Sequence, residues 1–191
     1  MGCKTYNTLF YKLNCIILAF CLVPGQAFAA LYIVDSTADT VDAAPGDWVC
    51  ADVTGNCSLR AAIMEANADP GSDIVNLGAA TYTLTIPGNA EHAAATGDLD
   101  ILGPVTINGV SPAATIIDGG GIDRVFEIIN GGNVSISRLT VQNGVAGVNT
   151  PDYFVNYVGG GIYNVGNTSA VNLYEVDVRN NSAQRGGGVY N

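Results

Sequence analysis

Positive charge is scarce in this chain, and lysine is absent beyond position 12. Seven Lys and Arg side chains stand against seventeen Asp and Glu, which gives a formal net charge of −10 at pH 7. Such a surface repels phosphate backbones and anionic lipid, so we expect no nucleic-acid partner. An acidic surface is compatible with calcium binding, or simply with solubility outside the cell.

Histidine and cysteine are also sparse. His92 is the only histidine, in a polar loop beside Glu91, so we expect it to be solvated and not part of a triad. The two cysteines beyond position 21, Cys50 and Cys57, are seven residues apart. Half of a zinc site would need a matching Cys or His cluster, which the sequence lacks. A disulfide that closes a short loop is therefore predicted, and it requires an oxidising compartment.

The N-terminus has the pattern of an export signal. A basic segment with both lysines precedes an apolar run over 13–23 and the small-x-small site Ala27-Phe28-Ala29. We expect residues 1–29 to be removed and the mature chain to begin at Ala30. The apolar run is too short for a comfortable membrane span, and we expect no transmembrane segment after cleavage. Loss of the two lysines changes the formal net charge from −10 to −12.

One segment, 58–68, has the pattern of an amphipathic helix. Ser58 is a suitable N-cap because its hydroxyl can accept a hydrogen bond from a free backbone N–H. The apolar residues recur at helical spacing and form one stripe: Leu59, Ala62, Ile63 and Ala66. Asp69-Pro70-Gly71 ends the helix. We expect the stripe to cover one end of the remaining fold, clamped by the disulfide.

Glycine-punctuated repeats fill the second half of the chain. Gly-Gly-Gly-Ile-Tyr-Asn at 159–164 returns as Gly-Gly-Gly-Val-Tyr-Asn at 186–191, and 134–143 aligns with 171–180. This self-similarity, with short candidate strands and no further helix, is typical of parallel stacking in a solenoid.

The aligned repeat also predicts corners. Apolar residues fall at 134 and 136 and then at 139 and 141, so the strand should bend at 137–138. Asn143 and Asn180 follow at equivalent places, where stacked amides would form a ladder with a spacing of about 4.8 Å.

A family resemblance adds to this interpretation. Residues 57–63, Cys-Ser-Leu-Arg-Ala-Ala-Ile, resemble the box that names the CSLREA-domain proteins, and 97–101 and 123–126 are similar to later parts of that pattern. The glycine repeats resemble those of right-handed parallel β-helices and, more loosely, of polymorphic outer-membrane proteins. Ala61 replaces the box glutamate, so half of a capping box is missing. The resemblance implies an exported or cell-surface protein and no uniform activity.

The predicted fold is all-β: a right-handed parallel β-helix (solenoid) with a short N-terminal capping helix. We divide the chain into a signal peptide at 1–29, an N-terminal cap at 30–73 and a β-helix at 74–191. The second glycine repeat would open a new coil, so we expect the β-helix to continue into further coils or to meet a partner at that end.

Candidate catalytic residues come from carboxylates and one arginine. Parallel β-helix enzymes of the lyase and hydrolase type place such groups on an outer face. The cluster here is Asp98, Asp100, Asp118, Asp123 and Arg124. Asp98 and Asp100 share a strand face and are the candidate calcium ligands; no other cofactor is indicated. The alternative is that all five are turn residues and outward polar positions.

Aromatic residues in the segment 145–158 are candidate ligand-binding residues. Tyr153, Phe154 and Tyr157 could stack on sugars or on a protein partner, or they could pack the segment onto the solenoid. We therefore expect a secreted or cell-surface structural or binding module of adhesin-like type, with a glycan or cell-surface protein as partner. The alternative is a carbohydrate-active β-helix enzyme, a polysaccharide lyase or hydrolase that depends on calcium.

Overall fold

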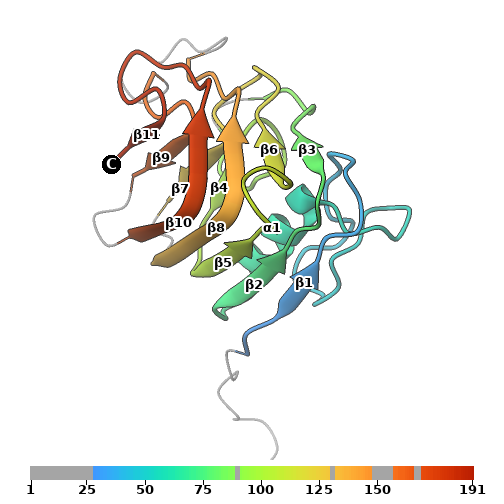
Figure 1. Cartoon of the computed structure of the whole chain (residues 1–191). Coiled ribbons are helices and arrows are strands. Elements are labelled where there is room, and N and C mark those ends of the chain that lie inside the picture. Colours follow the sequence, from blue (N-terminus) through green and yellow to red (C-terminus); the bar gives the residue numbers. More distant parts are fainter. Residues whose placement is uncertain (1–27, 89–90, 130–131, 148–156, 166–168) are drawn as a thin grey trace, which may run out of the picture.

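The fold is mostly β, with two parallel sheets and one helix (Figure 1). The computed structural model describes residues 28–88, 91–129, 132–147, 157–165 and 169–191. Every strand pairing within these ranges is parallel, as the stacked repeats predict.

Sheet A has seven strands and curls, and sheet B has four (Figure 1). Sheet A contains β1 (Leu31–Ile33), β2 (Asp73–Asn76), β3 (Thr81–Thr83), β5 (Val105–Asn108), β6 (Ile116–Asp118), β8 (Asn133–Gln142) and β10 (Ala170–Arg179). Sheet B contains β4 (Leu99–Ile101), β7 (Phe126–Ile128), β9 (Ile162–Asn164) and β11 (Val189–Tyr190). Segments far apart in sequence are thus neighbours, such as β4 and β7 or β2 and β5.

Both long strands bend where the alignment predicts a corner. Arg138 in β8 and Glu175 in β10 have φ near +53°, in the left-handed region, although neither is glycine. The first half of β8 pairs with β5 and its second half with β6. The bend lets all four predicted inward residues of β8 be fully buried: Val134, Ile136, Leu139 and Val141.

Helix α1 (Leu59–Ala68) begins and ends as its sequence predicts. The Ser58 hydroxyl accepts a hydrogen bond from the Ala61 N–H at 3.0 Å, and Asp69 is the C-cap. The stripe of Leu59, Ala62, Ile63 and Ala66 is buried in the same core cluster as the apolar side chains of both sheets. The helix contacts β2 of sheet A and β4 of sheet B, so it lies against an early strand of each sheet.

The predicted boundary at residue 73 falls at the first residue of β2. Strand β1 extends sheet A by pairing with β2, and Tyr32 and Val34 join the common core. The segment 30–73 and the strands that follow it therefore share one hydrophobic core.

Two short strands, β9 and β11, were not among those expected from the sequence, and the glycine triplets lead directly into them. Strand β4 contains Leu99 and Asp100 of the segment whose two aspartates were expected to share a strand face. All three belong to sheet B. Two or three residues in length, they alternate core residues with polar or aromatic ones and resemble loops in the sequence.

Hydrogen-bonded amides stack along sheet A, but at a different corner from the one predicted. The Asn108 amide donates to Asn76 Oδ1 at 3.1 Å, and the Ser137 hydroxyl donates to Asn108 Oδ1 at 2.9 Å. Asn143 and Asn180 do hold equivalent left-handed positions, with φ of 58° and 55°. The Asn143 amide, however, donates to Asp118 Oδ2 at 2.7 Å, and within the described residues no hydrogen bond joins it to Asn180. A nearby carboxylate thus takes the place that the ladder would have filled.

Candidate functional site

One row of side chains projects from sheet B on the side opposite the core. The strand register places Asp100 beside Glu127, Glu127 beside Tyr163, and Tyr163 beside Tyr190. The flanking residues of β4 and β7, such as Leu99 and Phe126, are fully buried in the core. Two carboxylates and two tyrosines therefore form what we call the outer row.

Arg124 ties the outer row to two further carboxylates. Its Nη1 lies 2.9 Å from Glu127 Oε2, and its Nε lies 3.3 Å from Asp98 Oδ2 and 4.0 Å from Asp123 Oδ1. The guanidinium also lies over the Tyr163 ring, 5.2 Å from the centroid, and Tyr163 meets Tyr190 edge to face at 5.8 Å. One cation is thus surrounded by three carboxylates and an aromatic face.

These charged groups are almost entirely buried. Asp98, Asp100, Asp123 and Arg124 each have less than a tenth of their surface exposed. Burial, followed by the repulsion of Asp123, raises the pKa of Asp98 well above its ordinary value, against the lowering effect of Arg124. Burial likewise raises the pKa of Asp123. Burial thus makes the charged form of both carboxyls less favourable, and the Arg124 guanidinium opposes this effect.

The loop before β4 covers Asp100. The Ala94 N–H donates to Asp100 Oδ2 at 2.9 Å, and Glu91 fixes the loop by accepting from the Ala93 and Thr96 N–H groups. Burial raises the pKa of Asp100 to about 7, although the Ala94 hydrogen bond opposes the rise. A carboxyl with this pKa can exchange a proton near neutral pH.

Of the five residues predicted as a cluster, four come together and one does not. Asp98, Asp100, Asp123 and Arg124 share the site on sheet B. Asp118 lies on β6 of sheet A, where its carboxylate accepts from Gln142, Asn143 and the Gly120 N–H. These contacts are those of a residue that organises a turn, which was the alternative weighed for the whole cluster.

Two members of the site were missed by sequence reasoning. Glu127 lies 27 positions after Asp100, the same offset that separates the two glycine repeats, so the repeat period is a signal that could have found it. His92, expected to be only solvated, is 62% exposed at its side chain. Its Nδ1 nevertheless lies 3.8 Å from Asp100 Oδ1 and 4.0 Å from Glu127 Oε2.

Arg60 of the predicted helix supports the site from behind. Its guanidinium is fully buried, pairs with Asp39 at 2.6 Å, and donates to the carbonyl oxygens of Ala94, Gly97 and Asp98 at 2.8–3.2 Å. The helix thereby fixes the loop that carries Asp98 and covers Asp100. No periodicity in the sequence indicates this role, because the partners are backbone carbonyls more than thirty residues away.

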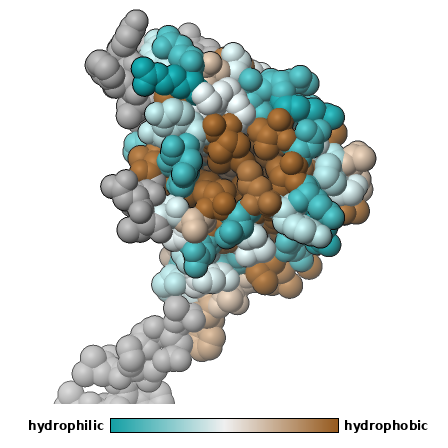
Figure 2. Space-filling model, turned by 60° about the vertical axis from the view of Figure 1, so that its left-hand side comes forward, coloured by the Kyte–Doolittle hydropathy of each residue, from teal (hydrophilic) through white to brown (hydrophobic). Residues whose placement is uncertain are grey.

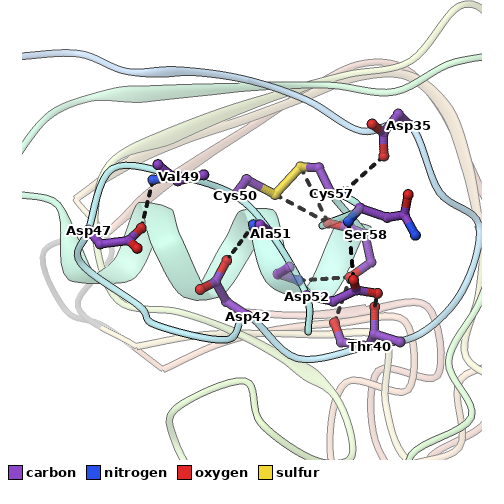
Figure 3. The surroundings of a disulfide bond; sticks show 12 residues. Asp35, Thr40, Asp42, Asp47, Val49, Cys50, Ala51, Asp52, Cys57 and Ser58 are labelled. Carbon is purple, nitrogen blue, oxygen red and sulfur yellow. Dashed lines mark hydrogen bonds between the residues drawn. A yellow bond between two sulfur atoms is a disulfide. The ribbon is translucent and has the colours of Figure 1, made fainter. Parts of the chain in front are cut away.

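The disulfide is confirmed and lies beside the helix N-terminus (Figure 3). Cys50 and Cys57 are joined with a Cα–Cα distance of 5.1 Å. Asp52 of the closed loop accepts a hydrogen bond from the Thr54 hydroxyl. Asp52 also accepts from the Thr40 hydroxyl, and Asp42 accepts from the Ala51 N–H of the loop (Figure 3). Carboxylates thus satisfy the backbone and hydroxyl donors of this turn-rich segment.

The predicted aromatic ligand site lies largely outside the described residues. Tyr153 and Phe154 fall in the undescribed segment 148–156. Tyr157 is partly buried, and its carbonyl oxygen accepts from the Gln184 and Arg185 N–H groups.

No family model, curated protein or solved structure matches the chain. The CSLREA resemblance therefore stays a prediction. Within the described ranges, no helix has the length and apolar character needed to cross a membrane.

Proposed function

We propose that the chain is an exported right-handed parallel β-helix of the CSLREA type. Strands recur in sets of three, β2-β3-β4 and then β5-β6-β7, and each pairs in parallel with its equivalent in the next set. The two halves of β8 with β9, and β10 with β11, continue the series. Right-handed connections between parallel strands are by far the most common, which supports the handedness.

Export to the cell exterior is supported by the disulfide and the leader pattern. A Cys50–Cys57 bond persists only in an oxidising compartment, and a small-x-small site precedes Ala30. The mature protein is then a secreted or cell-surface chain.

The proposed function is that of a structural or binding module, adhesin-like in type. One observation carries it: Asp98, Asp123 and Glu127 are buried around Arg124, whereas an apolar face is exposed. Leu173 and Val189 on β10 and β11 are 41% and 42% exposed. They line a hollow of about 380 Å³ together with Ile162 and Val171. Figure 2 shows apolar side chains gathered at the centre of this side of the molecule, with polar ones around them.

This apolar face is the proposed working surface. Strand β10 pairs with β8 on one side, and the described residues supply no strand for its other side. An apolar surface next to an unpaired strand edge favours association. We propose that a cell-surface partner binds this face, while a glycan is the alternative ligand, held by Tyr153, Phe154 and Tyr157.

The alternative function is a carbohydrate-active enzyme. The observation that favours it is the buried Asp100, whose pKa is raised to about 7. Its neighbour in the outer row, Glu127, is paired with Arg124. A carboxyl of this kind suits acid–base chemistry on a sugar, and calcium on Asp98 and Asp100 would assist it. Asp98 Oδ2, however, already lies 3.3 Å from Arg124 Nε.

One experiment separates the two functions. The mature chain is incubated with polyuronates and calcium while the absorbance of unsaturated product is followed, and its binding to cell surfaces is measured in parallel. We expect no turnover, and binding that is lost in Leu173→Glu but kept in Tyr174→Glu, an exposed neighbour on β10. Turnover that disappears in Asp100→Asn would overturn the binding function in favour of the enzyme.

A further inference from the structure

Three possible metal-ligand atoms, each from a different segment of the fold, converge at the end of the outer row that the loop before β4 covers. His92 Nδ1 from the loop, a carboxylate oxygen of Asp100 from β4 and one of Glu127 from β7 all lie within 4.8 Å of one another. The strands fix the two carboxylates through their parallel register, and the exposed imidazole closes the third side.

A second observation points to a ligand at this place. Asp100 is fully buried, and its Oδ2 accepts from the Ala94 N–H, but its Oδ1 has no hydrogen-bond donor among the described residues. A buried carboxylate oxygen without a donor is costly. This Oδ1 is the atom that faces the His92 imidazole.

We propose that His92, Asp100 and Glu127 bind a divalent transition cation, with Zn²⁺ as the best match. One imidazole nitrogen and two carboxylate oxygens are common zinc ligands, whereas calcium takes oxygen ligands alone. Ligand atoms around zinc lie about 3–3.5 Å apart, because each is about 2.0–2.2 Å from the metal. The present distances from His92 Nδ1, 3.8 Å to Asp100 Oδ1 and 4.0 Å to Glu127 Oε2, shorten to this range with a small movement of the exposed His92 side chain. Glu127 Oε2, which lies 2.9 Å from Arg124 Nη1, would be shared between the cation and the guanidinium. This site does not depend on whether the module binds or cleaves glycans.

The single histidine provides a direct test. Untagged mature protein is titrated with Zn²⁺ while the NMR signals of its one imidazole are followed, and calorimetry gives the stoichiometry and Kd. We expect saturation at one Zn²⁺ per chain, and a Kd that rises at least about tenfold in His92→Ala or Glu127→Gln. The exposed Asp177→Asn is the matched control and should leave the Kd unchanged. His92 is largely exposed, so His92→Ala should fold even if a buried variant does not. Absence of saturable binding, or binding unaffected by His92→Ala, would overturn the proposal.

A separate contact joins the predicted mature N-terminus to a buried carboxylate. The Ala30 N–H donates to Asp73 Oδ1 at 2.8 Å. Asp73 is the first residue of β2 and is fully buried, and burial raises its pKa. Its Oδ2 has no hydrogen-bond donor among the described residues.

Removal of the leader would change the chemistry of this contact. Hydrolysis of the Ala29–Ala30 bond adds water, leaving a carboxylate on Ala29 and an α-ammonium on Ala30. The peptide nitrogen carries one proton and the ammonium three, so two new donors and a positive charge arise next to Asp73. The backbone of Phe28 also passes so close to Gly71 that a Cβ on that glycine would lie 2.2 Å from the Phe28 oxygen.

We infer that leader cleavage at Ala30 creates a part-buried ion pair with Asp73 that stabilises the processed chain. This inference rests on the proposed export, and two measurements keep the parts distinct. The N-terminal mass of the exported protein tests the cleavage site by itself. The ion pair is tested on chains that begin at Ala30 regardless of how they are made.

The comparison uses the chain with a free Ala30 amine and the same chain acetylated at that nitrogen. We expect the free amine to have a melting temperature about 5 °C higher or more, because the acetylated form leaves Asp73 without its counter-charge. In the Asp73→Asn variant, the free and the acetylated forms should have the same melting temperature. Equal melting temperatures in the wild type would overturn the inference, and this arm needs no variant that might fail to fold.

Discussion

Arg60 is the residue whose loss should cost the fold most. It pairs with the buried Asp39 and satisfies three carbonyl oxygens of the loop before β4. Arg60→Ala removes the cation beside Asp39, which keeps only the Thr85 and Ile86 N–H groups as donors, and leaves the three carbonyl oxygens without their guanidinium donor. We therefore expect the free energy of unfolding to fall by about 3–5 kcal/mol. Urea denaturation measures the change.

Two matched substitutions make this prediction specific. Arg60→Lys keeps the charge but loses the planar fork, so it should recover only part of the stability. Arg179→Ala removes an exposed arginine paired with Asp177 and should cost less than about 1 kcal/mol. Equal effects of Arg60→Ala and Arg179→Ala would contradict the structural role of Arg60.

Asp52 should make stability depend on acid pH. The Thr54 hydroxyl and then the Asn56 N–H lower the pKa of Asp52 to about 2. A carboxyl with a lowered folded-state pKa stabilises the fold above its unfolded-state pKa of about 3.9, and this contribution is lost as pH falls toward 2. The melting temperature of Asp52→Asn should thus lie below that of the wild type at pH 7 and approach it at pH 2.5.

The control for this pH dependence removes only the Thr54 hydroxyl, the largest cause of the lowered pKa of Asp52. Thr54→Val deletes the hydroxyl that donates to Asp52 and should reduce the pH-dependent difference without abolishing it. A difference between Asp52→Asn and the wild type that is constant from pH 7 to pH 2.5 would contradict the assignment.

At the scale of elements, glycine permits the close approach of backbone segments that are distant in sequence. A Cβ on Gly144 would lie 2.0 Å from the Gly160 carbonyl oxygen. Gly144→Ala must therefore push two backbone segments apart, and we expect a loss of about 1–3 kcal/mol in the free energy of unfolding.

Gly103→Ala is the matched control for this crowding. The nearest atom to a Cβ there is the Ala66 oxygen at 3.9 Å, so the extra methyl fits. Chemical denaturation of both variants should give a clear loss for Gly144→Ala and little change for Gly103→Ala. The reverse order would show that the turns do not pack as described.

The same scale shows which elements the sequence can predict. Helix α1 was predicted from its Ser58 cap and apolar stripe, because both signals are local. The bend at Arg138 was predicted because four inward residues change phase there. Strands β9 and β11 were not predicted, because two or three residues carry no periodicity. Their identity depends on pairing with strands at least 27 positions away.

The candidate site was predictable only in part for a related reason. Asp98, Asp100, Asp123 and Arg124 are close in sequence to two equivalent strands, so their type and spacing brought them together. Glu127 lies beside Asp100 because of the strand register, and His92 lies there because its loop folds back over the sheet. Asp118 lies elsewhere, on sheet A, where its carboxylate accepts hydrogen bonds within a turn.

At the scale of the whole molecule, the disulfide should stabilise the N-terminal segment that carries α1. The Cys50–Cys57 loop is short, and closing it should stabilise the fold by about 2–3 kcal/mol. We expect the Cys50→Ala/Cys57→Ala double variant to melt earlier, with the loss appearing in calorimetry of the mature chain. Reduction of the wild type should produce the same shift, and a reduced protein of full stability would contradict the clamp.

The contact between Ala30 and Asp73 would have a practical consequence if the leader is removed at Ala30. Both lysines lie before position 13, so residues 30–191 hold no lysine side chain, and the α-amino group of Ala30 would be their one primary amine. That amine is part-buried against Asp73. Amine-directed cross-linkers, aldehydes and reducing sugars would then find one poorly accessible target within residues 30–191. This part of the chain would therefore react little in glycation or in lysine-based cross-linking.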